Sequence, residues 1–218
     1  MTLLGNGNAN PFEAGNDELE RYALEECVKR QRFDREVTVL IAPAGDWELT
    51  VKFVRLGATV SLCDHPSRQQ DIEGRIRAAG LGNAISFVPG EVASLPEDFP
   101  GEPFDIIVLR GGLCGLPYEQ ARRIVRRLLL ELRIGGKLYV SILGLHSELG
   151  EGYAGVDSRI EERYAELSPT MVKKYGISGP VCLYTERNLF MLLLEAGGSV
   201  LRTMTTTYGN VKGVAVRV

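Results

Sequence analysis

Short apolar runs alternate with longer amphipathic segments from residue 37 onward, and this alternation restricts the possible folds more than any other feature of the chain. The runs are continuous and rich in β-branched residues, as expected of parallel strands that are buried on both faces. They lie at residues 37–42, 59–63, 84–88, 104–109 and 137–143. Segments with helical spacing lie between them, at residues 47–56, 67–79 and 118–133. Strands that alternate with helices predict an α/β fold in which helices cover both faces of a mostly parallel sheet.

The N-terminal region has a different pattern. Residues 1–16 are rich in Gly and Asn and show no periodicity, which predicts a flexible tail. A helix is expected to follow, with Asn16 or Asp17 as its cap. We therefore expect a tail over residues 1–16 and one domain over residues 17–218.

The C-terminal third also departs from simple alternation. Residues 144–184 contain no strong strand, and a helix is expected around Asp157–Leu167. A connection of this length in a compact domain is typical of a lid or a substrate-binding insert. Beyond a helix that follows Thr185, two β-rich runs at 200–208 and 211–218 meet at Gly209-Asn210, which predicts an antiparallel hairpin.

Composition excludes several classes of protein. Of the 218 residues, 44% are hydrophobic and 24% are charged, which is typical of a globular protein rather than a disordered one. No apolar run approaches the roughly 18–20 residues that a membrane span needs. The net charge of −3 argues against nonspecific nucleic-acid binding. The four cysteines are widely spaced, so neither a metal site nor a disulfide framework is indicated, and without a secretory signal a cytoplasmic location is expected.

Ligands bind to parallel α/β sheets at the carboxyl ends of the strands, near the point where the strand order reverses. The residues that directly follow each predicted strand are therefore the candidates for a functional site. They lie at 42–48, 64–66, 89–92, 110–115 and 144–156.

Three stretches of sequence carry a resemblance to a known family. LIAPAGDWELTVKFVRLGATVSLCD (40–64) is similar to its first strand, glycine-rich turn, helix and acid-ended second strand. FVPGEVASLPEDFPGEPFDIIVLRGGLCGL (87–116) is similar to its third and fourth strands, and RRIVRRLLLELRIGGKLYVSIL (122–143) to its next helix, paired glycines and fifth strand. Over residues 37–218 the chain thus resembles class I S-adenosylmethionine-dependent methyltransferases. The resemblance implies a three-layer, Rossmann-like α/β fold with five parallel strands and a C-terminal antiparallel hairpin.

The resemblance also implies a site for S-adenosylmethionine and a role for particular residues. The turn Pro43-Ala44-Gly45 would approach the methionine part of the cofactor, and Asp64 would accept hydrogen bonds from both ribose hydroxyls. The residues expected beside the adenosine or facing the methyl donor are His65, Gly90, Glu91, Val92, Arg110 and Gly111. From the residues alone, Asp64 can instead cap the next helix, and Glu91 and Arg110 can pair with each other or with neighbours.

The turn after the first strand departs from the family pattern. The family has Gly-x-Gly-x-Gly, whereas the matching positions here are Pro43, Gly45 and Trp47, and Ile41 replaces the usual acid. Glycine matters at such a turn because the backbone must approach the ligand closely. The Trp47 indole can pack into the helix, stack beside the ligand or fill the site.

Two residues are candidates for catalysis. His146 follows the fifth strand and can accept a proton from a hydroxyl or amine, because histidine titrates near neutral pH. An exposed loop position is the alternative. Tyr153 lies among glycines in the insert and can act as a lid aromatic or as a turn anchor.

The sequence therefore predicts methyl transfer from S-adenosylmethionine to a small-molecule acceptor by in-line displacement, with positioning as the main source of rate. The short insert suits a compact substrate, and a homodimer through the N-terminal helix or the insert is compatible with the sequence. The alternative is a methyltransferase-like binding or scaffold protein without catalytic activity, which the altered turn favours. A nicotinamide-dependent oxidoreductase fits less well because no G-x-G-x-x-G occurs at the first turn.

Overall fold

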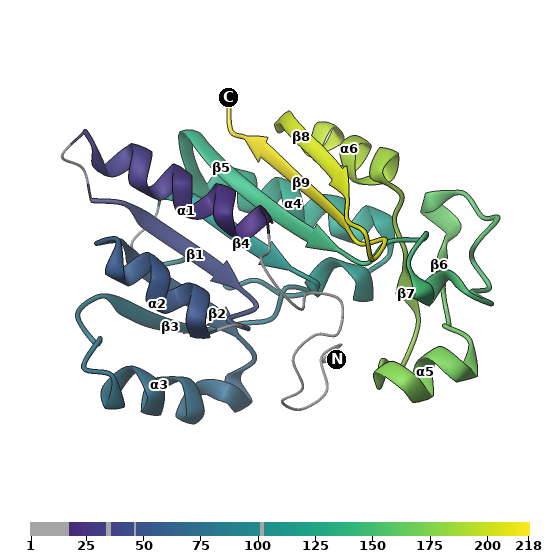
Figure 1. The fold of residues 1–218 in the computed structure, drawn as a ribbon, viewed down its shortest axis with the longest axis horizontal. Helices are drawn as coiled ribbons and strands as arrows, with labels where there is room; N and C mark the ends of the chain where they lie inside the picture. Colours follow the sequence, from purple (N-terminus) through teal and green to yellow (C-terminus); the bar gives the residue numbers. More distant parts are fainter. Residues whose placement is uncertain (1–17, 34–35, 46, 101–102) are drawn as a thin grey trace.

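The computed structural model describes residues 18–33, 36–45, 47–100 and 103–218. The predicted tail and the predicted cap at Asn16 or Asp17 lie outside these residues. A seven-stranded sheet with the order β3-β2-β1-β4-β5-β9-β8 forms the centre of the molecule (Figure 1). Its strands are β1 (Thr38–Ala42), β2 (Thr59–Asp64), β3 (Ile85–Pro89), β4 (Phe104–Arg110), β5 (Leu132–Ile142), β8 (Ser199–Thr205) and β9 (Val211–Val216).

The strand order reverses next to β1. From β1 the chain adds β2 and then β3 on one side, and it returns to add β4 and then β5 on the other side, all in parallel. β9 runs antiparallel to β5, and β8 runs antiparallel to β9. The five parallel strands thus end at one edge of the sheet, with the switch point between β1 and β4. The predicted fold class, including the C-terminal hairpin, is confirmed.

Alternate residues of the central strands enter two separate cores. One core lies under α1 (Glu18–Gln31), α2 (Trp47–Arg55) and α3 (Gln69–Ala78), and it takes Ile41 and Val108 from the sheet. The other lies under α4 (Tyr118–Glu131) and α6 (Glu186–Glu195), and it takes Leu40 and Leu109. Side chains alternate across a strand, so a continuous apolar run supplies both cores.

Buried charged groups hold α1 against the amino-terminal ends of the central strands. Asp105 in β4 is 1% exposed; it accepts a hydrogen bond from Arg30 Nη1 at 3.1 Å and another from the backbone N–H of Thr38 at 3.1 Å. Glu26 bonds to Lys137 Nζ at 2.6 Å and to Arg30 Nε at 2.9 Å. Burial raises the pKa of Glu26, but Lys137 and Arg30 outweigh it and hold that pKa below its ordinary value.

The sequence pattern suggested that the paired glycines separate the helix from the fifth strand. In the structure they do not. β5 begins at Leu132, directly after α4, and Gly135 and Gly136 lie within it. The register against β4 shifts between Phe104 and Ile106, and Gly135 has a φ of +76°. An L side chain rarely adopts this φ, so glycine allows the strand to continue through an irregular register.

The helix predicted around Asp157–Leu167 is wrong. This stretch holds a single 3₁₀ turn, Ile160–Glu162, and the short strand β6 (Tyr164–Ala165), which pairs with β7 (Val181–Cys182). The helix of this region is α5 (Pro169–Tyr175). Proline is favoured in the first turn of a helix, so Pro169 was the overlooked signal.

Among the described residues, no helix is long and apolar enough to cross a membrane.

The Asp105 network yields a prediction about stability. Asp105→Ala should lower the free energy of unfolding by about 3 kcal/mol or more, because it removes the carboxylate that compensates the mostly buried Arg30. Urea unfolding monitored by circular dichroism measures this change. The matched control is Asp71→Ala, which breaks an exposed pair with Arg75 on α3 and should cost less than about 0.5 kcal/mol. Similar losses in the two variants would contradict the role assigned to Asp105.

Candidate functional site

The turn after β1 brings backbone to the carboxyl edge of the sheet. Ala44 is buried, whereas Gly45 is exposed and has a φ of +40°, in the region that favours glycine. Trp47 begins α2 and is partly buried against the core beneath α1, α2 and α3. The structure thus favours the first of the three placements considered for Trp47, in which the indole packs into the helix layer.

Asp64, the last residue of β2, holds its carboxylate in a fixed orientation. The side chain is 6% exposed. Oδ1 accepts a hydrogen bond from the backbone N–H of His65 at 2.7 Å, and Oδ2 accepts one from Arg68 Nη1 at 2.8 Å. A carboxylate has about four lone-pair positions, so these two bonds leave capacity for a ligand. The sequence did not identify Arg68, because its contact with Asp64 depends on the turn that joins β2 to α3.

The segments that follow β2 and β3 are joined by a histidine–carboxylate contact. His65 Nδ1 accepts a hydrogen bond from the backbone N–H of Ser67 at 3.1 Å. The proton of a neutral ring must then lie on Nε2, which is 3.0 Å from Glu91 Oε1. The backbone N–H of Gly90 also donates to the carbonyl of Asp64 at 2.9 Å. The structure therefore brings together four of the predicted site residues.

Two glycines allow the segment after β3 to pack closely. A Cβ at Gly90 would lie 2.8 Å from Pro96 Cδ and 3.3 Å from Cys63 Sγ. A Cβ at Gly112 would lie 2.6 Å from Val92 Cγ2, so the segments after β3 and β4 are in contact at this point. Sequence reasoning placed Val92 in the site but did not identify Gly112.

The end of β4 meets the first turn of α1. Arg110 Nη1 lies 2.7 Å from Glu20 Oε1, and both side chains are mostly buried. Gly111 follows with a φ of +71°, and its N–H donates to the carbonyl of Ser141 at 2.8 Å. Glu91 pairs with His65 and Arg110 with Glu20, which agrees with the alternative that these charged groups pair with neighbours. The sequence did not identify Glu20, which lies beside the candidate site.

The two candidates for catalysis have different surroundings. His146 is exposed in the turn after β5. Tyr153 is 2% exposed; its hydroxyl donates to the carbonyl of Val181 at 2.6 Å and also contacts the carbonyl of Arg163. Burial raises the pKa of Tyr153 to about 12. This geometry favours the turn-anchor alternative for Tyr153 over a lid or a proton-transfer role.

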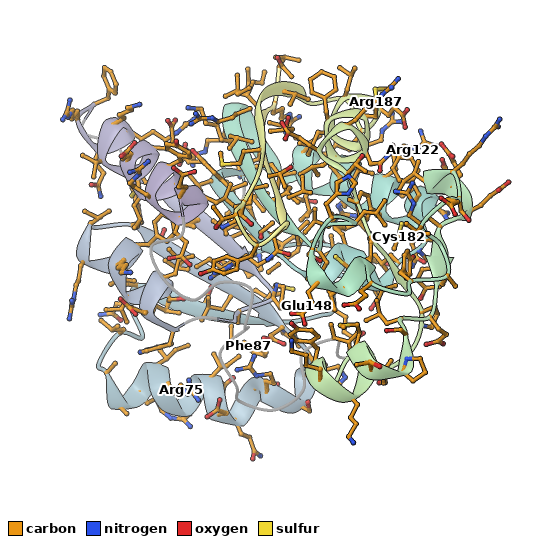
Figure 2. The ribbon with its side chains drawn as sticks, turned by 45° about the vertical axis from the view of Figure 1, so that its right-hand side comes forward. Arg75, Phe87, Arg122, Glu148, Cys182 and Arg187 are labelled. Carbon is orange, nitrogen blue, oxygen red and sulfur yellow. The ribbon has the colours of Figure 1, made fainter. Side chains whose placement is uncertain are left out.

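Buried hydrogen bonds tie the insert to the rest of the domain. Arg163 donates to the carbonyl of Leu183 at 3.2 Å and to Asn188 Oδ1 at 2.9 Å, and Asn188 belongs to the capping box of α6. Glu148, which is labelled in Figure 2, bonds to Lys174 and Tyr175 of α5. The insert thus has its own framework of hydrogen bonds beside the carboxyl edge of β5.

All four cysteines are buried free thiols. Burial, with a smaller contribution from Asp64, raises the pKa of Cys63 to about 12. Burial also raises the pKa of Cys114 to about 12 and those of Cys27 and Cys182 to about 11. Since the thiolate is the reactive form, these cysteines should be inert in the folded protein.

This predicts the outcome of alkylation. Iodoacetamide at pH 8 should add no label to the native protein within an hour and four labels after unfolding in guanidinium chloride, as measured by intact mass. Rapid labelling of any cysteine in the native protein would show that its side chain is more accessible than the structure indicates.

Tyr153→Phe tests the anchoring role of the hydroxyl. The substitution leaves the Val181 and Arg163 carbonyls without this donor, so it should lower the free energy of unfolding by about 1–2 kcal/mol in urea. Tyr208→Phe, at an exposed tyrosine, should change it by less than about 0.5 kcal/mol. Equal stability of the two variants would remove the basis for calling Tyr153 an anchor.

Comparison with known proteins places this geometry in a wider context. No family model and no curated protein sequence matches the chain. Solved structures do match. An S-adenosylmethionine-dependent methyltransferase from Methanosarcina mazei is 20% identical over 84% of this chain and 93% of that chain, with a TM-score of 0.63. An O-methyltransferase family protein from Burkholderia thailandensis is 16% identical, with a TM-score of 0.62.

The lengths covered differ among these neighbours. The chain covers 56% of the length of that O-methyltransferase family protein. It covers 80% of a second protein from Burkholderia thailandensis, the 1,6-didemethyltoxoflavin-N1-methyltransferase, whose structure contains 1,6-didemethyltoxoflavin and S-adenosylhomocysteine; the identity is 19% and the TM-score 0.60. With the strand order and the carboxyl-edge geometry described above, these matches show that the chain has the fold of class I S-adenosylmethionine-dependent methyltransferases.

Proposed function

We propose that the protein transfers a methyl group from S-adenosylmethionine to a small-molecule acceptor. The observation that carries this proposal is the pair of oriented carboxylates, Asp64 and Glu91, at the ends of the neighbouring strands β2 and β3. Both lie on the same side of the switch point, where ligands of such sheets bind.

The donor and acceptor chemistry of these residues fits an adenosine. The ribose presents two hydroxyl donors and adenine presents an amino donor, and carboxylates only accept hydrogen bonds when ionised. Asp64 would bind the ribose hydroxyls, and Glu91 would face the adenine amino group. The loop at Gly111 fits a close ligand as well, because among the described residues no atom beyond the adjoining ones lies within 4 Å of the position that a Cβ would take there.

The other half of the cofactor would lie over β1 and β4. Its amino-acid end carries an ammonium and a carboxylate, and the oppositely charged pair Glu20–Arg110 stands at the end of β4. The exposed turn at Gly45 would allow the backbone to approach the same end. The partial burial of Trp47 against the core beneath α1, α2 and α3 supports a site that the indole does not fill.

The protein's part in the reaction would be positioning. When bound, S-adenosylmethionine supplies a methyl group that is already activated on a sulfonium centre. Asp64 and Glu91 would hold the adenosine in one orientation, and the ends of β4 and β5 with the insert would align an acceptor for in-line attack. His146, exposed after β5, is our candidate for accepting the proton that a hydroxyl or amine acceptor releases.

We infer that the acceptor is a small molecule. The insert is short and tied down by Arg163, which suits a compact substrate. One neighbour was solved with 1,6-didemethyltoxoflavin and another, an O-methyltransferase family 2 protein from Planctomyces limnophilus, with apigenin. The alternative, a protein of this fold without catalytic activity, gains no support from these neighbours.

Isothermal titration with S-adenosylmethionine and S-adenosylhomocysteine tests the cofactor assignment. We expect micromolar binding that weakens about tenfold or more in Asp64→Ala, because charge-assisted hydrogen bonds to the ribose are lost. Asp71→Ala, which removes an exposed acid from the adjacent α3, should bind like the wild type. Absence of binding at millimolar ligand would contradict the proposal.

If binding is observed, release of S-adenosylhomocysteine during a screen of phenol and amine acceptors distinguishes an enzyme from an inactive binding protein.

A further inference from the structure

We propose that His65 determines the specificity of the cofactor site for adenine, by holding the Glu91 carboxylate in one orientation toward the 6-amino group. This inference rests on the proposed function and names a residue whose side chain acts on the ligand through another. His65 is therefore a positioning residue.

The ring of His65 is fixed from both sides. On one side, Nδ1 lies 3.1 Å from the backbone N–H of Ser67 and 2.7 Å from Ser67 Oγ. On the other side, Nε2 lies 3.0 Å from Glu91 Oε1. A 180° flip of the ring would place carbon atoms at both contacts, so the two contacts select the same orientation. The Ser67 backbone donor also selects the tautomer in which Nε2 carries the proton, so that Nε2–H donates a hydrogen bond to Glu91.

His65 also contacts the second carboxylate of the site. Its backbone N–H donates to Asp64 Oδ1 at 2.7 Å, while Arg68 bonds to Oδ2 of the same carboxylate. One residue therefore orients the proposed ribose acceptor with its backbone and the proposed adenine acceptor with its side chain. This arrangement fixes the relative placement of the two carboxylates before any ligand binds.

Glu91 needs such a partner in order to discriminate between bases. Its side chain is 31% exposed, and a glutamate without a fixed contact has several rotamers that point into solvent. A carboxylate held in place attracts a 6-amino group, which donates, and repels a 6-oxo group, which presents lone pairs. A carboxylate that can turn away from the base would tolerate both. The contact with His65 thus makes Glu91 selective for a 6-amino purine.

Two substitutions separate this role from the capping of the 3₁₀ turn Pro66–Arg68. In His65→Asn, the amide oxygen can replace Nδ1 as acceptor for Ser67, but the side chain is too short to reach Glu91. In His65→Gln, the amide nitrogen can replace Nε2 as donor to Glu91, whereas the contact with Ser67 is lost. Thermal unfolding verifies that both variants are folded.

The experiment compares the affinities of S-adenosylhomocysteine and its 6-oxo analogue, S-inosylhomocysteine, by isothermal titration. The wild type should prefer the adenosine ligand by about tenfold or more. In His65→Asn, and likewise in Glu91→Ala, the preference for the adenosine ligand should fall below about threefold. His65→Gln should keep a preference near that of the wild type.

Each outcome bears on the proposal. A wild-type ratio in His65→Asn, or an equal loss of the ratio in His65→Asn and His65→Gln, would overturn the specificity role of His65 and leave the cofactor assignment intact. If the wild type binds neither ligand, the proposed function itself fails, and this inference fails with it.

Discussion

The site depends on the burial of the central strands on both faces of one sheet. Because β1, β2 and β4 are almost entirely buried, their charged residues lie at or next to the ends of the strands. Parallel strands end at one edge, so residues as far apart in sequence as Asp64, Glu91 and Arg110 are gathered along it. The contacts at that edge, His65 with Glu91 and Arg110 with Glu20, then set the orientation of each charged group.

Buried charged groups hold α1 against the opposite, amino-terminal ends of the strands. Asp105 and Glu26 bind Arg30 and Lys137 near the start of β4, while Glu20 on the same helix reaches Arg110 at the end of β4. α1 therefore spans the face of the sheet from one edge to the other and contributes a carboxylate to the candidate site. A helix outside the alternating β-α pattern is in this way part of the functional geometry.

The sequence was sufficient for what depends on local pattern. Strand positions, the parallel sheet, the hairpin and the row of residues at the strand ends all follow from apolar runs and the turns between them. The sequence was insufficient for features that are determined by tertiary contacts. Tyr164–Ala165 has no strand signal of its own and becomes a strand only by pairing with Val181–Cys182. The partners of Arg110 and Glu91 come from other elements, and nothing in their sequence spacing indicates them.

We propose that an adenosine-containing cofactor lies across the ends of β1 to β4, held by Asp64 and Glu91. Hydrogen–deuterium exchange with and without S-adenosylhomocysteine tests it most directly, because bound ligand reduces local opening. We expect slower exchange in peptides that cover residues 43–47, 64–68 and 90–92, with little change in α5 or β8. Slower exchange confined to the insert or to the hairpin, or no slowing at saturating ligand, would rule out this placement of the cofactor.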